Sequence, residues 1–230
     1  MADGSSGEFR HGARDILPLA LGVVFYGAAF GVLATQAGMS GLDVGIMGTL
    51  VFAGSAQIVA VERLVAGAGA AAAIVAGLAL NLRLVLVSAS VRDIYANRPW
   101  WQVLVGAHYT TDENWAMMLK RRAEGETAGW GYMVGSGLVL MAAWIGSGVA
   151  GTLFASTIPD PKAFGIDFAF AAAFIAIACA LWRGKTDFAP WLTAAGVAIL
   201  AAITGAIDTS WAIVLGGLAG AAVAGITADV

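Results

Sequence analysis

Charged residues are scarce in this chain of 230 residues. Only 12% of the residues are Asp, Glu, Lys or Arg and 60% are hydrophobic, whereas ordinary soluble domains carry roughly 25% charged residues. Several apolar runs approach the length of about 20 residues that a helix needs to cross a bilayer. This balance excludes an ordinary soluble domain and predicts an all-α, polytopic membrane helix bundle.

Cysteine, basic charge and the motifs of common enzymes are also lacking. The single Cys179 excludes an intramolecular disulfide, and the formal net charge of −3 provides no basic surface for nucleic acid. The chain contains no nucleotide-binding loop, no GxSxG and no HExxH. We therefore expect no cofactor, no metal site and no enzymatic activity. The alternative in the enzyme class is an intramembrane hydrolase with Ser55 as nucleophile and His108 as base.

Polar stretches divide the chain into a tail and one transmembrane domain. Residues 1–15 are polar and contain glycine and serine, so we expect a disordered cytoplasmic tail followed by a single transporter domain over residues 16–228. About eight apolar runs are expected to cross the membrane: Ile16–Thr35, Val44–Val61, Ala70–Val91, Gln102–Leu119, Tyr132–Leu153, Ile166–Trp182, Trp191–Gly205 and Trp211–Ile226. If a re-entrant loop replaces a crossing between Val44 and Val91, the number falls to seven or six.

A break in the second expected helix is predicted at the run FAGSAQ, Phe52–Gln57. Gly54 weakens helix propensity, and Ser55 and Gln57 place hydrogen-bonding groups where the bilayer supplies no water. Backbone groups freed at membrane depth survive only beside protein or a hydrated cavity. A broken or re-entrant helix at this run would therefore be a candidate binding site. The alternative is a small-residue packing face in which Ser55 bonds to its own helix.

The distribution of cations predicts the orientation in the membrane. With eight crossings, one side collects Arg10, Arg14, Arg63, Lys120, Arg121, Arg122, Arg183 and Lys185, and the other keeps Arg92, Arg98 and Lys162. Cytoplasmic loops carry the excess of Lys and Arg, so the sequence predicts a multi-pass protein with a cytoplasmic N-terminus. Glu62 and Arg63 are interpreted as a solvated helix end.

Ionisable residues inside two of the expected spans are costly in a bilayer. A mid-membrane Arg costs roughly 2.5–3.5 kcal/mol on translocon scales, so Arg83, which follows Asn81 in the third span, should be paired, face the interior or snorkel to an interface. The fourth span holds Asp112 and Glu113, which cannot both stay charged cheaply. His108 and Asp112 share a face if that helix is continuous. We expect Arg83 to compensate one carboxylate, in a substrate or proton pathway or in a structural ion pair.

Two further patterns concern helix packing. Gly27 with Gly31, and Gly216 with Gly220, form small-residue faces that predict close helix neighbours, and we expect at least one face to contact a partner subunit. Near the break, FAGS resembles WIGS in the fifth span, and the two expected spans run in opposite directions. Such a match between spans of opposite direction is typical of a weak inverted repeat. The alternative is a chance match in a chain with 31 glycines.

Five short motifs together resemble one known family. They are FAGSAQ at Phe52–Gln57, NLR at Asn81–Arg83, TDE at Thr111–Glu113, WIGSGVAG at Trp144–Gly151 and IDFAF at Ile166–Phe170. In this order and at these intervals they are similar to the AzlC family of branched-chain amino acid exporters. The resemblance implies export of leucine, isoleucine and valine across the bacterial cytoplasmic (inner) membrane, together with a small AzlD-type membrane subunit. Where the family often has His after NLR, this chain has Leu84, which argues against a proton relay through that position.

The residues and the resemblance lead to one hypothesis for the site. A zwitterionic aliphatic amino acid needs donors for its carboxylate, an acceptor for its ammonium group and an apolar pocket. We expect these from Gly54, Ser55, Gln57, Asn81 and Arg83, from Asp112 or Glu113, and from Phe52, Phe168 and Phe170, respectively. One methylene is worth only about 1–3 kcal/mol in an apolar pocket, so methionine should overlap with the branched-chain substrates.

The driving force follows from what the chain lacks. Without a nucleotide-binding loop, accumulation against a gradient requires an ion gradient, and we expect proton antiport through Asp112 or Glu113. The alternative to a transporter is a non-transporting subunit or a channel of a membrane complex.

Overall fold

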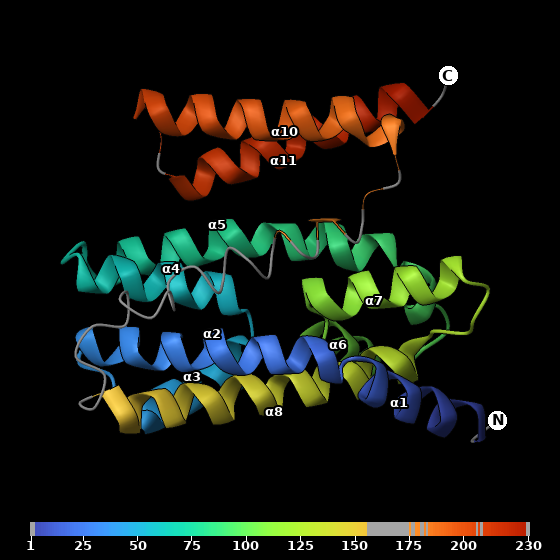
Figure 1. The fold of residues 1–230 in the computed structure, drawn as a ribbon, viewed down its shortest axis with the longest axis horizontal. Helices are drawn as coiled ribbons and strands as arrows, with labels where there is room; N and C mark the ends of the chain where they lie inside the picture. The colour runs from blue at the N-terminus through green and yellow to red at the C-terminus, as the bar shows by residue number, and fades with distance from the viewer. Residues whose placement is uncertain are drawn as a thin grey trace.

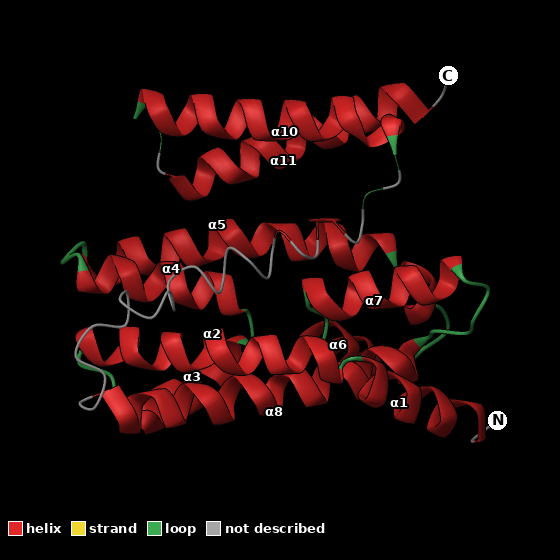
Figure 2. Cartoon of the chain, viewed as in Figure 1, coloured by secondary structure: helices red, strands yellow, loops and turns green. Residues whose placement is uncertain are grey.

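The computed structural model describes residues 3–155, 175, 178–179, 182, 184–205, 207 and 209–228. These residues are helical with short connections and contain no strand, which confirms the expected all-α class (Figure 2). The elements are α1 (Asp3–Asp15), α2 (Leu17–Gln36), α3 (Gly41–Val51), α4 (Gly54–Val65), α5 (Gly69–Ser90), the 3-10 helix η1 (Arg92–Tyr95), α6 (Trp100–His108), α7 (Asp112–Ala123), α8 (Trp130–Phe154), α10 (Lys185–Thr204) and α11 (Thr209–Ala228). Helices α2, α5, α8 and α10 are each long and apolar enough to cross a membrane, and α3 and α11 contain shorter apolar stretches. Most of the expected sixth span, Ile166–Trp182, lies outside the described residues.

The N-terminal segment is helical rather than disordered. Helix α1 packs across the first turns of α8, where a Cβ on Gly12 would overlap the carbonyl oxygen of Tyr132. Its last residue, Asp15, forms an ion pair with Arg121 at 2.7 Å and accepts a hydrogen bond from the Tyr132 hydroxyl at 3.2 Å. The polar composition suggested disorder because these partners come from distant parts of the chain. The structure therefore corrects the expectation of a disordered tail.

The expected second span is a helical hairpin made of α3 and α4. Helix α3 has 11 residues and α4 has 12, so at about 1.5 Å per residue each is roughly half as long as the ~30 Å hydrocarbon core is thick. Gly41 at the start of α3 faces Thr152 near the end of α8, and Gly48 faces Ile145, so α3 runs antiparallel to α8. The chain breaks at Phe52, and α4 then turns back (Figure 1).

The direction of α4 follows from its packing on α5. Ser55 at the start of α4 bonds to Arg83 late in α5, and Ala60 faces Gly77 earlier in α5, so these two helices are antiparallel. Helix α5 ends beside the start of α8, at the far end of the bundle (Figure 1). The outer ends of α3 and α4 therefore lie at the same end of the bundle. This hairpin is re-entrant, as the interpretation of FAGSAQ as a broken or re-entrant helix predicted, and it replaces the expected crossing Val44–Val61.

Helices α6 and α7 form a second re-entrant hairpin in place of the expected fourth span. Trp130, the first residue of α8, donates its indole N–H to the carbonyl of Gln102 in the first turn of α6 at 2.8 Å. Arg122, in the last turn of α7, donates to the carbonyl of Ala128 just before α8 at 2.8 Å. Both outer ends thus lie beside the start of α8, and this hairpin enters from the end opposite to the first (Figure 1). Apolar composition did not distinguish it from a crossing.

Helices α2 to α4 and α5 to α7 repeat one order of elements in opposite directions. Each set is a long helix followed by a hairpin, and α2 and α5 run in opposite directions (Figure 1). The counterpart of the break at Phe52 is the break at Tyr109–Thr111. The segment Trp144–Ser147, whose sequence resembles FAGS, lies instead inside the continuous helix α8. The inverted arrangement is thus carried by backbone path and not by that sequence match.

The two glycine faces are used within the chain. Gly27 and Gly31 of α2 face α8, where a Cβ on Gly31 would overlap the carbonyl oxygen of Gly148. On α11, Gly216 and Gly220 face α10 in the same way. Close backbone approach of this kind is what small residues allow in membranes. The expectation that one of these faces contacts a partner subunit is therefore wrong, because both are already covered.

Basic residues gather at the end of the bundle where α8 begins. This set comprises Arg10 and Arg14 of α1, Arg92 and Arg98 around η1, and Lys120, Arg121 and Arg122 at the end of α7. Arg63, in the last turn of α4, lies at the other end. The two hairpins thus reverse the expected placement of Arg63, Arg92 and Arg98 relative to the Lys120–Arg122 cluster.

Candidate functional site

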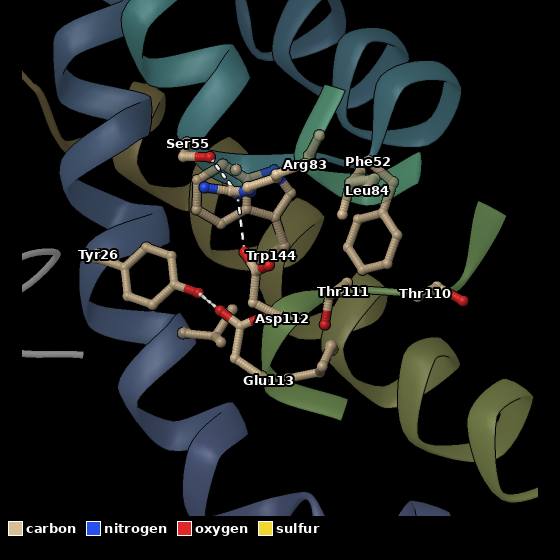
Figure 3. Close-up of a pocket in the computed structure, with 14 residues that line it drawn as sticks. Tyr26, Phe52, Ser55, Arg83, Leu84, Thr110, Thr111, Asp112, Glu113 and Trp144 are labelled. Carbon is tan, nitrogen blue, oxygen red and sulfur yellow. Dashed lines mark hydrogen bonds and ion pairs between the residues drawn. The ribbon is translucent and has the colours of Figure 1, made fainter. Parts of the chain in front are cut away.

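The tips of the two hairpins meet at a small cavity inside the bundle (Figure 3). Its volume is about 40 Å³, and its lining comes from both hairpin breaks and from α2, α5 and α8. The expected site residues that line it are Phe52, Gly54, Ser55, Arg83, Asp112 and Glu113. Gln57 and Asn81 are not part of the lining, and Phe168 and Phe170 lie outside the described residues.

The first break exposes the start of α4 to the cavity. Phe52 has φ 19° and ψ 63°, and Ala53 precedes the helix without any side-chain cap on its first N–H groups. Gly54 allows Trp144 to lie against the backbone, because a Cβ there would come within 3.3 Å of the ring. The first turn of a helix carries unpaired N–H donors and the positive end of the helix dipole. Gly54 and Ser55, the first residues of α4, line the cavity, so this helix end lies beside it.

The second break is closed by a capping box. The Asn114 side chain accepts from the N–H of Thr111 at 2.8 Å, and the Thr111 hydroxyl accepts from the N–H of Asn114 at 3.4 Å. Asn114 is fully buried and also donates to the carbonyl of Tyr109 at 2.6 Å. Sequence reasoning missed this helix start, although Thr111 followed by acidic residues and Asn114 is a recognisable N-terminal signal. Because the helix breaks here, His108 and Asp112 do not share one helical face.

An ion pair joins the two hairpins through α5. Arg83 Nη2 lies 2.8 Å from Asp112 Oδ2 in the second hairpin and donates a hydrogen bond to the Ser55 hydroxyl in the first. The side chains of Arg83 and Asp112 are 30% and 15% exposed, respectively. Asp112 also lies in the first turn of α7, where the helix dipole favours a negative charge. The expectation that Arg83 is paired is confirmed.

The second carboxylate has a different environment. The Tyr26 hydroxyl of α2 donates to Glu113 Oε1 at 2.8 Å. In the part of the chain that the structure describes, Glu113 makes no ion pair. Figure 3 shows the Tyr26–Glu113 pair beside the Arg83–Asp112 pair. Nothing in the local sequence of α2 marked Tyr26 as a site residue, because its partner is 87 positions away.

Gln57 does not line the cavity but contacts Trp144, which does. It is fully buried, and its side-chain oxygen accepts the indole N–H of Trp144 at 2.7 Å. The Trp144 ring also stacks on Phe30 with 5.0 Å between ring centroids. Among the described residues, Gln57 Nε2 and Asn81 Oδ1 are buried without a hydrogen-bond partner. Gln57 therefore fixes the Trp144 ring rather than facing the cavity.

The hydrolase alternative would need Ser55 close to His108. Ser55 instead accepts a hydrogen bond from Arg83, and His108 lies against Phe52 and Tyr109, with ring centroids at 6.2 and 5.5 Å. No hydrogen bond joins Ser55 and His108 in the described part of the chain. The arrangement does not resemble an activated nucleophile, which requires a base within hydrogen-bond reach.

Comparisons with known proteins bear on the class of the molecule. The chain is 28% identical over 207 residues to inner membrane protein YgaZ of Escherichia coli, covering 86% of this chain and 82% of that protein. It is 26% identical over 200 residues to an uncharacterized membrane protein of Helicobacter pylori, covering 84% of each chain. No solved structure matches the chain. The chain is thus similar to bacterial membrane proteins over most of its length.

A family model described as AzlC protein matches residues 18–158. The matched segment contains both hairpins and all the described residues that line the cavity. It covers more than half of the sequence, and the chain therefore belongs to the AzlC family.

Proposed function

We propose that this protein is a secondary transporter that exports branched-chain amino acids across the bacterial cytoplasmic membrane by proton antiport, together with a small AzlD-type membrane subunit. The substrates are leucine, isoleucine and valine, with methionine as an overlapping substrate. Membership of the family supports a membrane transport role. The observation that carries the substrate class is the cavity itself, which sets a cation, two carboxylates and an apolar wall around one point.

The proposed binding pose divides the substrate among these groups. Arg83 and the uncapped N–H groups at the start of α4 bind the carboxylate, and Asp112 binds the ammonium group. Phe52 and Leu84 contact the aliphatic side chain. The Arg83–Asp112 pair therefore opens when substrate enters, and each partner exchanges one counter-charge for another.

Entry of substrate requires movement of the hairpins. The cavity of about 40 Å³ has room for a few water molecules, whereas ligand pockets typically have about 300–1,000 Å³. Each hairpin reaches the cavity from one end of the bundle, so separation of one tip at a time would open the site to one side at a time. We propose that this is how access alternates.

Glu113 is the proposed proton carrier. Asp112 is paired with Arg83, so its protonation would break an ion pair. Glu113 is held by the Tyr26 hydroxyl and can exchange a proton without that loss. A proton bound to Glu113 removes a negative charge next to Asp112, which weakens the site for an ammonium group. Proton and amino acid would then occupy the site alternately, as antiport requires.

The proposed orientation places the start of α8 in the cytoplasm. That end carries the basic residues of α1, η1 and α7, whereas the other end carries Arg63. The excess of Lys and Arg is the basis of the assignment. The N-terminus is then cytoplasmic, the second hairpin faces the cytoplasm and the first faces the periplasm.

Proteoliposomes with an imposed pH gradient test the proposal. Wild-type protein should exchange leucine for protons, and a protonophore should abolish accumulation. Glu113→Gln should keep leucine exchange but lose its response to the pH gradient, whereas Asp112→Asn should lose both. Glu62→Gln, exposed at the end of α4, is the matched control and should behave as wild type. Proton-driven transport in both cavity variants would exclude coupling through this pair.

The same assay separates a transporter from a non-transporting subunit or channel. Each chain is reconstituted alone and together with the small partner. Transport by the pair that keeps the Asp112→Asn defect assigns the substrate site to this chain. Transport by the partner alone would instead make this chain an accessory subunit.

A further inference from the structure

We propose that Leu84 sets the size of the amino-acid side chain that the cavity accepts. This inference rests on the proposed function and adds a residue that determines specificity. Leu84 directly follows Arg83 on α5, and both side chains line the cavity. In Figure 3, Leu84 lies beside Phe52, away from the Tyr26 and Glu113 side chains. One turn of α5 therefore supplies both the cation for the carboxylate and a wall for the side chain.

The cavity separates polar from apolar groups around this turn. The carboxylates of Asp112 and Glu113 come from the start of α7, and their partners are Arg83 and Tyr26. An amino acid bound by its ammonium and carboxylate groups at the polar side must direct its side chain elsewhere. Leu84 bounds the cavity on the apolar side, so it meets the end of that side chain.

A change in the size of residue 84 should change the volume of the cavity, because the neighbouring side chains are small. It packs against a small cluster of Ala53, Ala56 and Leu80, in which the first two side chains are single methyl groups. Two of these residues belong to the hairpin break and the start of α4. They offer little side chain that could move into space left by a shorter residue at position 84. A truncation should therefore enlarge the cavity.

The other apolar residues of the lining are poorer candidates for tuning. Val23, Phe52, Leu140 and Trp144 belong to the largest core cluster and are each at most 5% exposed. Trp144 is further fixed by Gln57. Substitution of these residues would disturb the packing of α2 and the first hairpin on α8. Leu84 lies outside that cluster, so its size can change with little effect on the core.

Competition assays with a graded panel of amino acids test the inference. The panel is valine, leucine, methionine and phenylalanine, measured as inhibition of leucine exchange by wild type, Leu84→Ala and Leu84→Phe. In an apolar pocket one methylene changes discrimination by roughly 10–200-fold. Leu84→Ala should raise the preference for phenylalanine over valine at least about tenfold, and Leu84→Phe should lower the preference for leucine over valine by a similar factor.

The control is Leu82→Ala, a neighbour on α5 that is 46% exposed and does not line the cavity. It should leave the ranking of the panel unchanged. If Leu84→Phe does not fold, Leu84→Val replaces it and should shift the ranking in the direction of Leu84→Ala. An unchanged ranking in folded Leu84 variants would overturn the role of Leu84 and leave the proposed function standing. Wild-type protein that transports no member of the panel would overturn the proposed function itself.

Discussion

The two hairpins share one architecture but differ in how the chain closes their tips. The first hairpin begins α4 without a cap, so its N–H donors remain available at the cavity. The second begins α7 with the Thr111–Asn114 capping box and carries Asp112 and Glu113 in that first turn. The positive helix end therefore faces the cavity from the first hairpin, whereas acidic side chains cover it in the second. Opposite charges of a zwitterion can thus be bound by two similar structures.

The base of the second hairpin is also fastened by ion pairs. Arg121 pairs with Asp15 of α1 at 2.7 Å, and Arg122 pairs with Asp93 of η1 at 2.9 Å. Helix α1 and η1 thus clamp the end of α7 at the surface. If the second hairpin moves during transport, it must move about this clamped end.

Arg83→Met should have the largest effect, because Arg83 links the two hairpins. The substitution leaves Asp112 without its cation in a largely buried setting. Loss of one partner of a buried pair costs roughly 3–5 kcal/mol, and partial exposure of Arg83 should bring the cost to about the lower limit of that range. Thermal unfolding in detergent measures the loss of stability, and leucine transport should be abolished.

A double variant sharpens this result. Arg83→Met combined with Asp112→Leu removes both charges, so most of the lost stability should return while transport stays absent. Recovery of transport would contradict the assignment of these two residues to substrate binding. A double variant no more stable than Arg83→Met would show that the pair is not coupled.

The glycines at which the hairpin tips meet α8 should respond unequally. A Cβ on Gly137 would overlap the carbonyl oxygen of Tyr109 in the second tip, whereas one on Gly54 would lie 3.3 Å from the Trp144 ring. Gly137→Ala must displace backbone and should cost roughly 1–3 kcal/mol, as overpacking does. Gly54→Ala should cost less, because a ring can shift. Gly146→Ala, with open space around it on α8, is the control in the same unfolding assay.

The helix caps provide a test with a smaller expected effect, in which one cap is removed and another is added. Thr111→Val removes the cap of α7 and should lower stability by about 1 kcal/mol. Ala53→Ser provides α4 with the cap that it lacks, so it should raise stability slightly and slow leucine transport. The reason is that the new hydroxyl would occupy N–H donors proposed for the substrate carboxylate. Faster transport by Ala53→Ser would contradict that use of the α4 terminus.

The smallest effect concerns the base of the second hairpin and depends on pH. The hydrogen bond from Arg122 lowers the pKa of Asp93. A carboxylate with a lowered pKa stabilises the folded protein above its ordinary value of about 3.9, and this stabilisation is lost as the pH falls through the lower folded value. The Asp93 side chain is 62% exposed, so the contribution should be below about 1 kcal/mol.

The measurement compares Asp93→Asn with wild type by chemical unfolding. The variant should be less stable at neutral pH, and the difference should shrink as the pH falls below about 3.9 and through the lowered folded pKa of Asp93. Glu124→Gln, an exposed residue after α7, should show no such convergence. A difference that persists at acid pH would mean that Asp93 acts through something other than its charge.

The sequence predicted the parts of this structure that are local. The break at Phe52–Gly54 was predicted because glycine and polar groups at membrane depth have a direct physical cost. The start of α7 had an equally local signal in Thr111 and Asn114. It was missed because Gln102–Leu119 was interpreted as one continuous span, with Asp112 on the same face as His108.

The direction of each half-helix had no such signal. Val44–Val61 is equally apolar whether the chain crosses or turns back, and only packing on α5 and α8 decides between the two. Tyr26 and Gln57 are similar cases, because their roles depend on Glu113 and Trp144, each 87 positions away. Residue types at the site could therefore be predicted in part, whereas their partners required the fold.

The sidedness of the hairpin ends tests the central claim most directly. In a Cys179→Ser background, single cysteines replace Ala66 after α4, Arg92 after α5 and Glu124 after α7, and a membrane-impermeant maleimide is applied to right-side-out and inverted vesicles. Two opposed re-entrant hairpins predict that Arg92→Cys and Glu124→Cys react from one face and Ala66→Cys from the other. Reaction of Ala66→Cys and Glu124→Cys from the same face, with Arg92→Cys on the opposite face, is the pattern of eight full crossings and would contradict the account.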